Sequence, residues 1–504
     1  MKKPYVLAIG ALAGVAAIAG AAGASTHKSV TPAKAKQAAV RKAYTGAPYL
    51  VRMHAGTEIK QILTVGDSVP KAGGGTYRMV GIPDGLGAFD NGDGTFTVLM
   101  NHELTSDKGI VRAHGGKGTF VSKWIVKKSD MSIVSGQDLM KATYVYANGT
   151  WAPASTSLSR FCSADLPALS AFYNEKTKLG YNGRLFMNGE ETGAEGTAWA
   201  HDMNGNSWQL PHLGRFSWEN SLANAWTGDK TVVVGTDDQG GGKGQVYVYV
   251  GDKKASGTTI EKAGLTGGKL YGIKVTGVAA ESSSSAIANG TAFSLYEFGD
   301  VSSWTGAKLE TESNANGVTN FRRPEDGSWD AKKPNVFYVN TTDSFGTAGR
   351  SRLYKLTFKD INNPQLGGTV DALLAGTEGQ QMLDNMGVDQ NGKRILLQED
   401  IGEQRQRGKL WMYNLNAGTL RNVAEFNDDL FNPEKPGFIT ADEETSGAIS
   451  VADILGKGWF LLTVQVHAPW APAGFTAPTP GFPFTDPELV EGGALVALYI
   501  PEPR

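Results

Sequence analysis

A degenerate repeat of a turn, a short apolar strand and a polar or acidic end runs along the chain and constrains its fold more than any other feature. The predicted strands are rich in β-branched and aromatic residues, which is typical of sheets. They are Thr95–Met100, Arg184–Met187, Thr231–Val234, Gln245–Val250, Asn335–Val339, Arg352–Phe358, Arg394–Leu397 and Trp459–Val466. Helical periods are scarce, and only Ser163–Asn174 is predicted to be a helix. The repeat therefore predicts an all-β fold.

Six of these strands run directly into polar or acidic residues. The six ends are Asn101-His102-Glu103, Asn188-Gly189-Glu190-Glu191, Gly235-Thr236-Asp237-Asp238, Asn340-Thr341-Thr342-Asp343, Gln398-Glu399-Asp400 and His467. Radial repetition of small sheets places equivalent strand ends around a common axis, so the pattern favours a β-propeller with insertions. The 65 Gly among 504 residues agree with many tight turns. A β-sandwich whose loops use Asp and Asn for turns is the alternative.

The spacing of the strands also predicts how they pair. Three pairs have the spacing of hairpins: 231–235 with 245–250, 335–339 with 352–358, and 394–398 with 409–413. The last predicted strand, Ala494–Ile500, is expected to pair with the N-terminal segment Tyr49–Leu63 and close the ring, which removes exposed edges. Residues 48–504 are therefore expected to form a single β-propeller domain.

The first residues of the chain have the features of an export signal. Lys2 and Lys3 precede an apolar run that ends in the A-x-A pattern of Ala22-Gly23-Ala24. A membrane anchor is the alternative, because the run approaches the length that spans a bilayer. We predict that residues 1–24 are a cleaved signal peptide and that residues 25–47 are a flexible linker. The mature protein is then expected to be secreted or periplasmic, without a membrane partner.

Charge, cysteine count and motifs exclude several classes of protein. With 48 Lys+Arg against 50 Asp+Glu, the formal charge of −2 gives no sign of a nucleic-acid partner. The single Cys excludes a disulfide framework. The chain contains no G-x-S-x-G, P-loop or H-E-x-x-H motif. His201, His212 and His467 stand alone in the sequence, so we expect structural roles for them.

The acidic strand ends are candidates for a metal site. Carboxylates that converge at an axis would repel one another unless a cation neutralised them, and many oxygen ligands favour Ca²⁺. Cys162 on its own is expected to be a small buried apolar residue, but near carboxylates its thiolate would select a transition metal such as iron. The candidate acids are Glu103, Glu190, Glu191, Glu219, Glu325, Glu399, Asp400, Glu443 and Glu444.

One short segment combines arginines with acids, Phe321-Arg322-Arg323-Pro324-Glu325-Asp326-Gly327. Residues two apart in an extended strand share one face, so Arg323 and Glu325 are expected to point the same way. Glu325 could then serve a metal while Arg323 binds an anionic substrate oxygen, because its planar fork matches phosphate. A surface salt bridge is the equal alternative.

Seven motifs together resemble the PhoX-type alkaline phosphatases, a bacterial family, from about Gly81 to His467: NGDGTFTVLMNHE, RFCSADL, NGEETG, GRFSWEN, RRPEDGSWD, LDNMGVD and LLQEDIG. The resemblance implies a six-bladed β-propeller with a mixed iron–calcium cluster at its central axis. It also implies Ca²⁺-dependent hydrolysis of phosphate monoesters outside the cytoplasm. Cys162 then resembles the thiolate ligand to iron and Arg323 the phosphate-binding arginine. Glu219 and Glu325 resemble carboxylate ligands, and the family acids near the metals correspond to Glu103, Glu191 and Glu399.

The chain departs from the family pattern at Lys2-Lys3, where a twin arginine is typical, after Cys162, and around Asp442-Glu443-Glu444-Thr445. The functional hypothesis is a monomeric secreted phosphatase acting on a small phosphate ester. In it a metal-activated oxide or hydroxide attacks the ester while Arg323 clamps the phosphate. One alternative is a non-catalytic, calcium-stabilised propeller used for binding. Another is a calcium-dependent lactonase or a phytase-like propeller.

Overall fold

The computed structural model of the chain describes residues 42–240, 242–343 and 351–502. These residues belong to one compact unit, Ala38–Arg504. The signal peptide predicted at residues 1–24 lies outside the described residues, as does most of the linker predicted at residues 25–47. No helix within the described ranges is long and apolar enough to cross a membrane.

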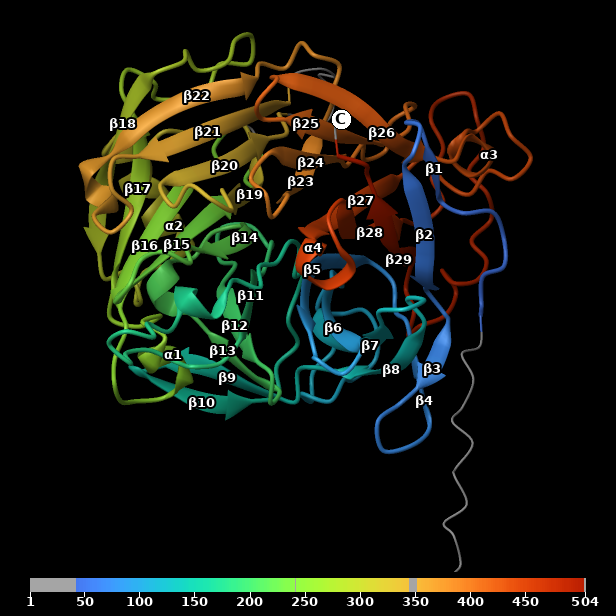
Figure 1. The fold of residues 1–504 in the computed structure, drawn as a ribbon, viewed down its shortest axis with the longest axis horizontal. Helices are drawn as coiled ribbons and strands as arrows, with labels where there is room; N and C mark the ends of the chain where they lie inside the picture. Colours follow the sequence, from blue (N-terminus) through green and yellow to red (C-terminus); the bar gives the residue numbers. More distant parts are fainter. Residues whose placement is uncertain (1–41, 241, 344–350, 503–504) are drawn as a thin grey trace, which may run out of the picture. The chain divides into compact units, whose positions relative to one another are not determined.

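The described chain is mostly β, and its sheets lie around a common centre (Figure 1). One four-stranded sheet has the order β5-β6-β7-β8, with β5 (Pro83–Asp90), β6 (Thr95–His102), β7 (Phe120–Lys127) and β8 (Ile133–Asp138). A five-stranded sheet has the order β10-β9-β13-β12-β11, with β9 (Ala142–Ala147), β10 (Thr150–Ala154), β11 (Leu185–Gly189), β12 (Ala198–Asp202) and β13 (Asn206–Gln209). The hairpin of β3 (Ser68–Pro70) and β4 (Thr76–Arg78) forms a separate two-stranded sheet that packs against β8.

A nine-stranded sheet follows, in the order β14-β15-β16-β17-β18-β22-β21-β20-β19. Its strands are β14 (Trp218–Ala223), β15 (Lys230–Asp237), β16 (Val246–Asp252), β17 (Lys269–Val275), β18 (Thr291–Gly299), β19 (Pro324–Trp329), β20 (Val336–Thr341), β21 (Arg352–Phe358) and β22 (Gly368–Leu374). The sheet β1-β26-β25-β24-β23 contains β1 (Leu50–Arg52), β23 (Leu383–Val388), β24 (Arg394–Glu399), β25 (Lys409–Asn414) and β26 (Thr419–Phe426). The sheet β2-β29-β28-β27 contains β2 (Glu58–Thr64), β27 (Glu443–Ser450), β28 (Trp459–Val466) and β29 (Gly492–Tyr499).

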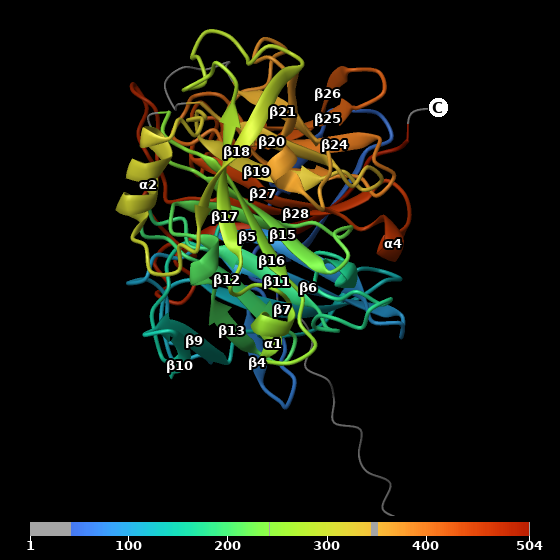
Figure 2. The ribbon, with the colours of Figure 1, turned by 90° about the vertical axis from the view of Figure 1, so that its left-hand side faces the viewer.

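Short helices connect the strands. They are α1 (Thr259–Lys262), α2 (Gly306–Ala315), α3 (Asp428–Phe431) and α4 (Ala452–Leu455), with 3₁₀ turns at Leu169–Ala171, Pro211–Leu213 and Pro364–Leu366. In the side view, α2 and α4 lie at opposite ends of the ring of sheets (Figure 2).

Six strands lie innermost and pack against one another around the centre. Strand β11 contacts β14, and the series continues through β19, β23 and β27 to β5. Residues 161–166, which we call the inner segment, lie along both β11 and β5. The inner segment pairs with β11 at Phe161↔Glu190 and Asp165↔Met187, and Gly85 of β5 donates its amide to the Cys162 carbonyl at 3.1 Å.

The strands next to the centre are buried because each sheet has neighbours on both faces. Strand β15 reads Lys-Thr-Val-Val-Val-Gly-Thr-Asp and is buried from Thr231 onward. β-Branched residues such as these pack well on a pleated, covered surface. The outer strand β26 instead alternates between exposed and half-buried positions over its first half, as expected at a solvated edge.

The predicted hairpins are confirmed, and the predicted partner of the last strand is confirmed in part, because Leu50–Arg52 of the segment Tyr49–Leu63 pairs with β26 instead. Strand β2 pairs with β29 from Glu58↔Tyr499 to Thr64↔Ala494, so an N-terminal strand completes the last sheet. The three predicted hairpins are the antiparallel pairs β15–β16, β20–β21 and β24–β25. Completing a sheet in this way hides backbone groups that would otherwise form open edges.

The helix predicted at Ser163–Asn174 is wrong. Asp165 and Met187 exchange two backbone hydrogen bonds, at 2.9 and 2.8 Å, so this part of the chain is extended. Pro167 disfavours the helical conformation for the residue before it and has no amide to donate. Only the 3₁₀ turn Leu169–Ala171 forms. The ten-residue helix α2 was missed, because only Gly306, Leu309 and Ser313 of it are buried, which leaves little apolar periodicity to read.

Gly85 allows the inner segment to approach β5, and its replacement should be costly. A Cβ at this position would lie 2.4 Å from the Ala164 amide nitrogen and 2.5 Å from the Ser163 carbonyl carbon. We expect Gly85→Ala to lower the free energy of unfolding by about 1–3 kcal/mol, because the backbone has to shift. Gly481→Ala is the matched control, since a Cβ there meets no atom within 4 Å. Chemical denaturation measures both, and equal stabilities would contradict the close approach.

Candidate functional site

One register recurs in the inner strands and positions the site. The first residue of an inner strand lies opposite the last residue of the next strand in five cases: Pro83↔His102, Trp218↔Asp237, Pro324↔Thr341, Leu383↔Glu399 and Glu443↔Val466. The inner segment has the same relation to the end of β11 through Phe161↔Glu190. The residue that follows each partner therefore lies at one common edge near the centre.

Twelve side chains occupy these equivalent positions. On the inner strands and the inner segment they are Asp84, Cys162, Glu219, Glu325, Asp384 and Glu444. On the neighbouring strands they are Glu103, Glu191, Asp238, Thr342, Asp400 and His467. In β5, β14, β19 and β23 a one-residue bulge follows the first pair. Such bulges re-aim side chains, and here the bulged residues are those that carry the acid.

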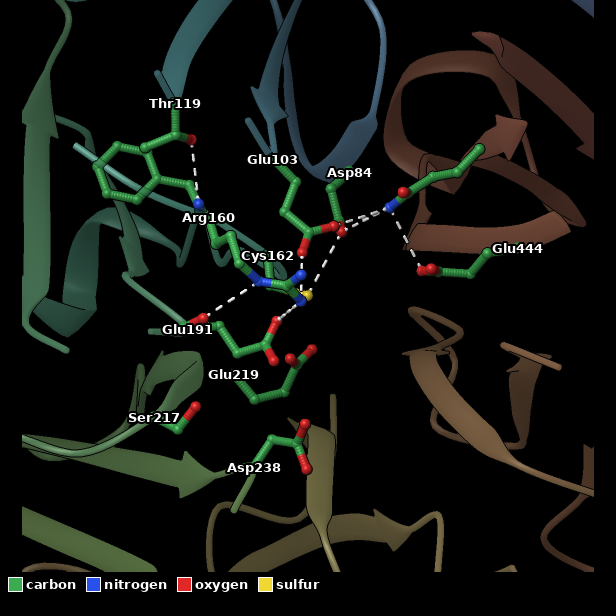
Figure 3. Close-up of polar contacts among 12 residues, drawn as sticks. Asp84, Glu103, Thr119, Arg160, Cys162, Glu191, Ser217, Glu219, Asp238 and Glu444 are labelled. Atoms are coloured by element: carbon green, nitrogen blue, oxygen red, sulfur yellow. Dashed lines mark hydrogen bonds and ion pairs between the residues drawn. The ribbon is translucent and has the colours of Figure 1, made fainter. Parts of the chain in front are cut away.

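Ten of these side chains, all except Asp84 and Thr342, line a cavity of about 570 Å³ together with two arginines. Its lining includes Glu103, Cys162, Glu191, Glu219, Glu325, Asp384, Asp400 and Glu444, with Arg160, Arg323 and His467 beside them. Figure 3 shows Asp84, Glu103, Glu191 and Glu219 turned toward the sulfur of Cys162 from separate strands. Groups that are far apart in the sequence thus share one space.

The possible ligand atoms form a continuous row. Four groups of three residues each hold their ligand atoms within 4.8 Å of one another: Asp84–Glu103–Cys162, Cys162–Glu191–Glu219, Glu219–Glu325–Asp384, and Asp384–Asp400–Glu444. Consecutive groups share one residue, namely Cys162, Glu219 and then Asp384. The arrangement could therefore hold several cations side by side with bridging ligands.

Burial raises the pKa of most of these acids, and their neighbours add to the shift. Burial and then repulsion from Glu103 raise the pKa of Asp84 well above its usual value. Burial raises the pKa of Glu191 to about 8, against the lowering effect of Arg160. Burial followed by repulsion from Glu444 raises the pKa of Asp400 to about 8. Burial first and nearby acids second raise the pKa values of Glu219, Asp384 and Cys162 well above the ordinary. Burial also raises the pKa of Glu325 well above its usual value, against the lowering effect of Arg323.

The two arginines each bind two acids of the cavity. Arg323 donates to Asp238 through Nε at 2.8 Å and Nη2 at 2.7 Å, and its Nη2 lies 3.0 Å from Glu325 Oε1. Arg160 places Nη2 2.7 Å from Glu103 Oε1 and also pairs with Glu191. These contacts hold both guanidinium groups at the wall of the cavity.

His467 lies in the cavity, although we expected it to be structural. Its Nδ1 lies 2.7 Å from Glu491 Oε2 and its Nε2 lies 3.6 Å from Glu444 Oε2. His201, by contrast, is buried within its sheet, where it makes hydrogen bonds to Ser207 and Asn188 at 2.8 and 2.9 Å.

Comparison with known proteins supports the fold. No model of a known protein family matches the chain, and no curated protein sequence matches it either. A similar solved structure is that of Pseudomonas fluorescens PhoX in complex with vanadate, a transition state analogue. The match covers 90% of this chain and 96% of that one, with a TM-score of 0.56 and 14% identity. At this identity the likeness concerns the fold alone.

Two further solved structures are less similar. The periplasmic gluconolactonase PpgL of Pseudomonas aeruginosa is 9% identical, covers 74% of this chain and 95% of its own, and has a TM-score of 0.33. The β-propeller domain of Cps50 (Swd1) from Myceliophteria thermophila is 8% identical, covers 84% of this chain and 98% of its own, and has a TM-score of 0.32. These scores are too low to support an argument. The sheet arrangement and the PhoX likeness together give a mostly β, β-propeller-like fold.

The structure brings together most of the residues that the sequence singled out. Glu103, Cys162, Glu191, Glu219 and Glu325 all belong to the row, and Arg323 lies beside it.

Glu399 lies apart from the row. Its Oε1 accepts hydrogen bonds from the Gln381 amide and the Trp411 indole, both at 2.8 Å, and its Oε2 accepts from the Lys409 amide at 3.0 Å. Successive residues of a strand face opposite sides, so the next residue, Asp400, points into the cavity in its place.

Four residues of the site were missed: Asp84, Asp238, Asp384 and Arg160. Asp238 lies in one of the six strand ends and Arg160 in the motif RFCSADL, but neither was predicted to be a site residue. Asp84 and Asp384 lie at the second position of an inner strand, whereas the repeat drew attention to the ends of the neighbouring strands. The sequence did contain a signal for these acids. The second residue is Asp or Glu in each of the strands β5, β14, β19, β23 and β27.

The buried acids predict how the stability of the metal-free protein depends on pH. Glu191 and Asp400 have folded-state pKa values of about 8, above reference values of 4.5 and 3.8. Their neutral forms contribute stability that is fully present below the unfolded pKa and is lost as the pH rises through the folded pKa. We therefore expect the melting temperature after chelation and dialysis to fall between about pH 5 and pH 8.

The control for this experiment is the same titration with Ca²⁺ added. Cations replace protons on the acids, so the stabilisation by Ca²⁺ should grow as the pH rises. A chelated protein that is as stable at pH 8 as at pH 5 would contradict the interpretation.

Proposed function

We propose that this protein is a metal-dependent phosphatase that hydrolyses phosphate monoesters at the centre of a six-bladed β-propeller. The observation that carries the proposal is the continuous row of buried acids and Cys162 with the guanidinium of Arg323 beside it. Metal ligands next to an arginine fork suit a phosphoryl group, whose negative charge both would stabilise.

The six equivalent positions support the number of blades. Each inner strand, or the inner segment in one case, starts one radial unit in the same register. The nine-stranded sheet then represents two blades, β14–β18 and β19–β22, which join where β18 pairs with β22. The remaining four sheets of four or five strands supply one blade each.

The donor set fits metal ions of two kinds. Asp84 is buried, and its Oδ1 has no hydrogen-bond partner among the described residues. A buried carboxylate left in this state is costly unless a cation neutralises it. Carboxylates suit Ca²⁺, whereas a thiolate selects a transition metal. We assign iron to the two groups that share Cys162 and Ca²⁺ to the two groups that share Asp384.

Different residues of the chain would have different roles at this site. When bound, the metal ions would polarise the ester oxygens and lower the pKa of water. Asp238 holds the plane of the Arg323 guanidinium through two hydrogen bonds, so the arginine is oriented before substrate arrives. Arg323 would then bind oxygens of the phosphoryl group and stabilise the charge that develops on it. The chain itself supplies no nucleophile in this scheme.

Phosphate release from 4-nitrophenyl phosphate tests the proposal directly. We expect turnover by protein loaded with iron and Ca²⁺, its loss after chelation, and its return when both metals are restored. Elemental analysis of the same samples measures the metals. A fully loaded protein that releases no phosphate from this ester or from alkyl phosphates would refute the phosphatase and favour a calcium-stabilised binding protein.

Arg323→Met should lower kcat/KM for 4-nitrophenyl phosphate by roughly 100- to 1,000-fold, as removal of a charge-stabilising donor usually does. Arg322→Met is the matched control, because Arg322 pairs with Asp343 and does not line the cavity. Steady-state kinetics at equal metal content compare the two. If both variants keep wild-type kcat/KM, Arg323 has no role in catalysis.

Substitution of two glutamates, one inside the ligand row and one outside it, tests which acids bind metal. Glu325→Gln should reduce the bound Ca²⁺, because it removes one charge from the group with Glu219 and Asp384. Glu399→Gln should leave the metal content unchanged, since Glu399 lies outside the row. Cys162→Ser should lower the iron content while retaining Ca²⁺. Elemental analysis of the three purified variants measures the bound metals. Loss of metal in Glu399→Gln alone would overturn the assignment of the ligand row.

A further inference from the structure

Arg160 occupies the same place relative to Cys162 that Arg323 occupies relative to Glu325. Each arginine lies two residues before an inner ligand of the row. Each also has a left-handed backbone, with φ of +49° at Arg160 and +57° at Arg323. Such values are uncommon for residues with a side chain. They also occur two residues before Asp84 and Asp384, at Ile82 (+49°) and Met382 (+47°), so one local geometry precedes four inner ligands and carries an arginine at two of them. This geometry presents two guanidinium groups to a single cavity.

The contacts of the two arginines are equivalent as well. Arg160 pairs with Glu103, which follows β6 in the preceding sheet, at 2.7 Å. Arg323 pairs with Asp238, which follows β15 in the preceding half of the nine-stranded sheet, also at 2.7 Å. Each arginine then reaches one acid of its own unit, Glu191 or Glu325. Each guanidinium group is thus held between an acid of the preceding unit and an acid of its own unit.

The arginines differ in how much of the side chain the cavity leaves open. The side chain of Arg160 is 42% exposed, against 15% for Arg323. The acids that Arg160 binds are themselves nearly buried, with 5% exposure for Glu103 and 13% for Glu191. The side chain of Arg160 therefore keeps more accessible surface than that of Arg323, beside a cavity of about 570 Å³ that has the size of a small-molecule site.

We propose that Arg160 binds a second phosphate of the substrate, so that the enzyme prefers organic bisphosphates to monophosphates. The inference rests on the proposed function and adds the substrate class to it. Arg323 holds the phosphoryl group that is cleaved, and Arg160 holds the one that remains on the product. Water adds to phosphorus as the ester P–O bond breaks, and the leaving oxygen takes a proton. The products are inorganic phosphate and the alcohol with its remaining phosphate.

The test compares glucose 1,6-bisphosphate with glucose 6-phosphate and glucose 1-phosphate on fully loaded protein. We expect kcat/KM for the bisphosphate to exceed the values for both monophosphates by about tenfold, mostly through a lower KM, as one charge-assisted contact would give. Arg160→Met should bring the ratio of kcat/KM for the bisphosphate to kcat/KM for each monophosphate close to one, whatever its effect on the absolute rates. Arg160→Lys keeps the charge and loses the fork, so it should retain part of the preference.

Arg184→Met is the matched control. Its guanidinium lies over the Phe89 ring, 4.6 Å from the centroid, and lines the cavity at the other end of the inner strands. This variant should keep the wild-type preference. A wild type without preference for the bisphosphate, or a preference that survives in Arg160→Met, would overturn the proposal. Loss of metal from both Arg160 variants would also overturn it, since the arginine would then serve only to hold Glu103 and Glu191.

Binding calorimetry with the same three sugar phosphates separates this inference from the proposed function. If none of them is hydrolysed, nor any other phosphate ester, the phosphatase proposal fails. Tighter binding of the bisphosphate by wild type, lost in Arg160→Met, would still support the role of Arg160. Equal binding of the three ligands by wild type would refute it.

Discussion

Mutual repulsion among buried carboxylates is the constraint on which the centre of this molecule depends. Acids from successive inner strands meet within 4.8 Å in overlapping groups, and burial raises their pKa values. Such a cluster is stable only with protons, arginines or metal ions to reduce its charge. The structure provides Arg160 and Arg323, which are too few for the acids present. The remaining charge is what a set of cations would neutralise, so metal binding and stability are coupled.

One backbone register creates this cluster and explains how much of it the sequence could predict. The turn–strand–acid repeat predicted the all-β fold, the hairpins and the β2–β29 closure, because these depend on local patterns of strands and turns. It also directed attention to Glu103 and Asp400, which follow the second strands. The repeat did not reveal that a one-residue bulge aims Asp84 and Asp384 at the same place, since a bulge has no apolar signature.

The two wrong predictions, Glu399 as a ligand and the helix after Cys162, also have physical causes. In Gln398-Glu399-Asp400 two neighbouring acids are equally plausible ligands until the pleat assigns them to opposite faces. The residues after Cys162 have an apolar spacing that fits a helix, yet β11 offers backbone partners that the sequence does not disclose. Tertiary pairing overrode local propensity at this point, and it did so beside the single cysteine of the chain. The choice matters, because an extended inner segment brings Cys162 to the acids.

Hydrogen-bond satisfaction distinguishes the acids that support the fold from those suited to bind a ligand. Glu325 and Asp326 are neighbours on β19, and both are buried. Asp326 accepts hydrogen bonds from the Asn220 side chain at 2.6 Å and from the Met386 amide at 3.0 Å, which ties β14 and β23 to β19. Asp84, by contrast, leaves one buried oxygen without a partner. Neighbouring acids on the inner strands therefore have separate functions: some have their hydrogen bonds satisfied and lock neighbouring strands together, and others remain available to cations.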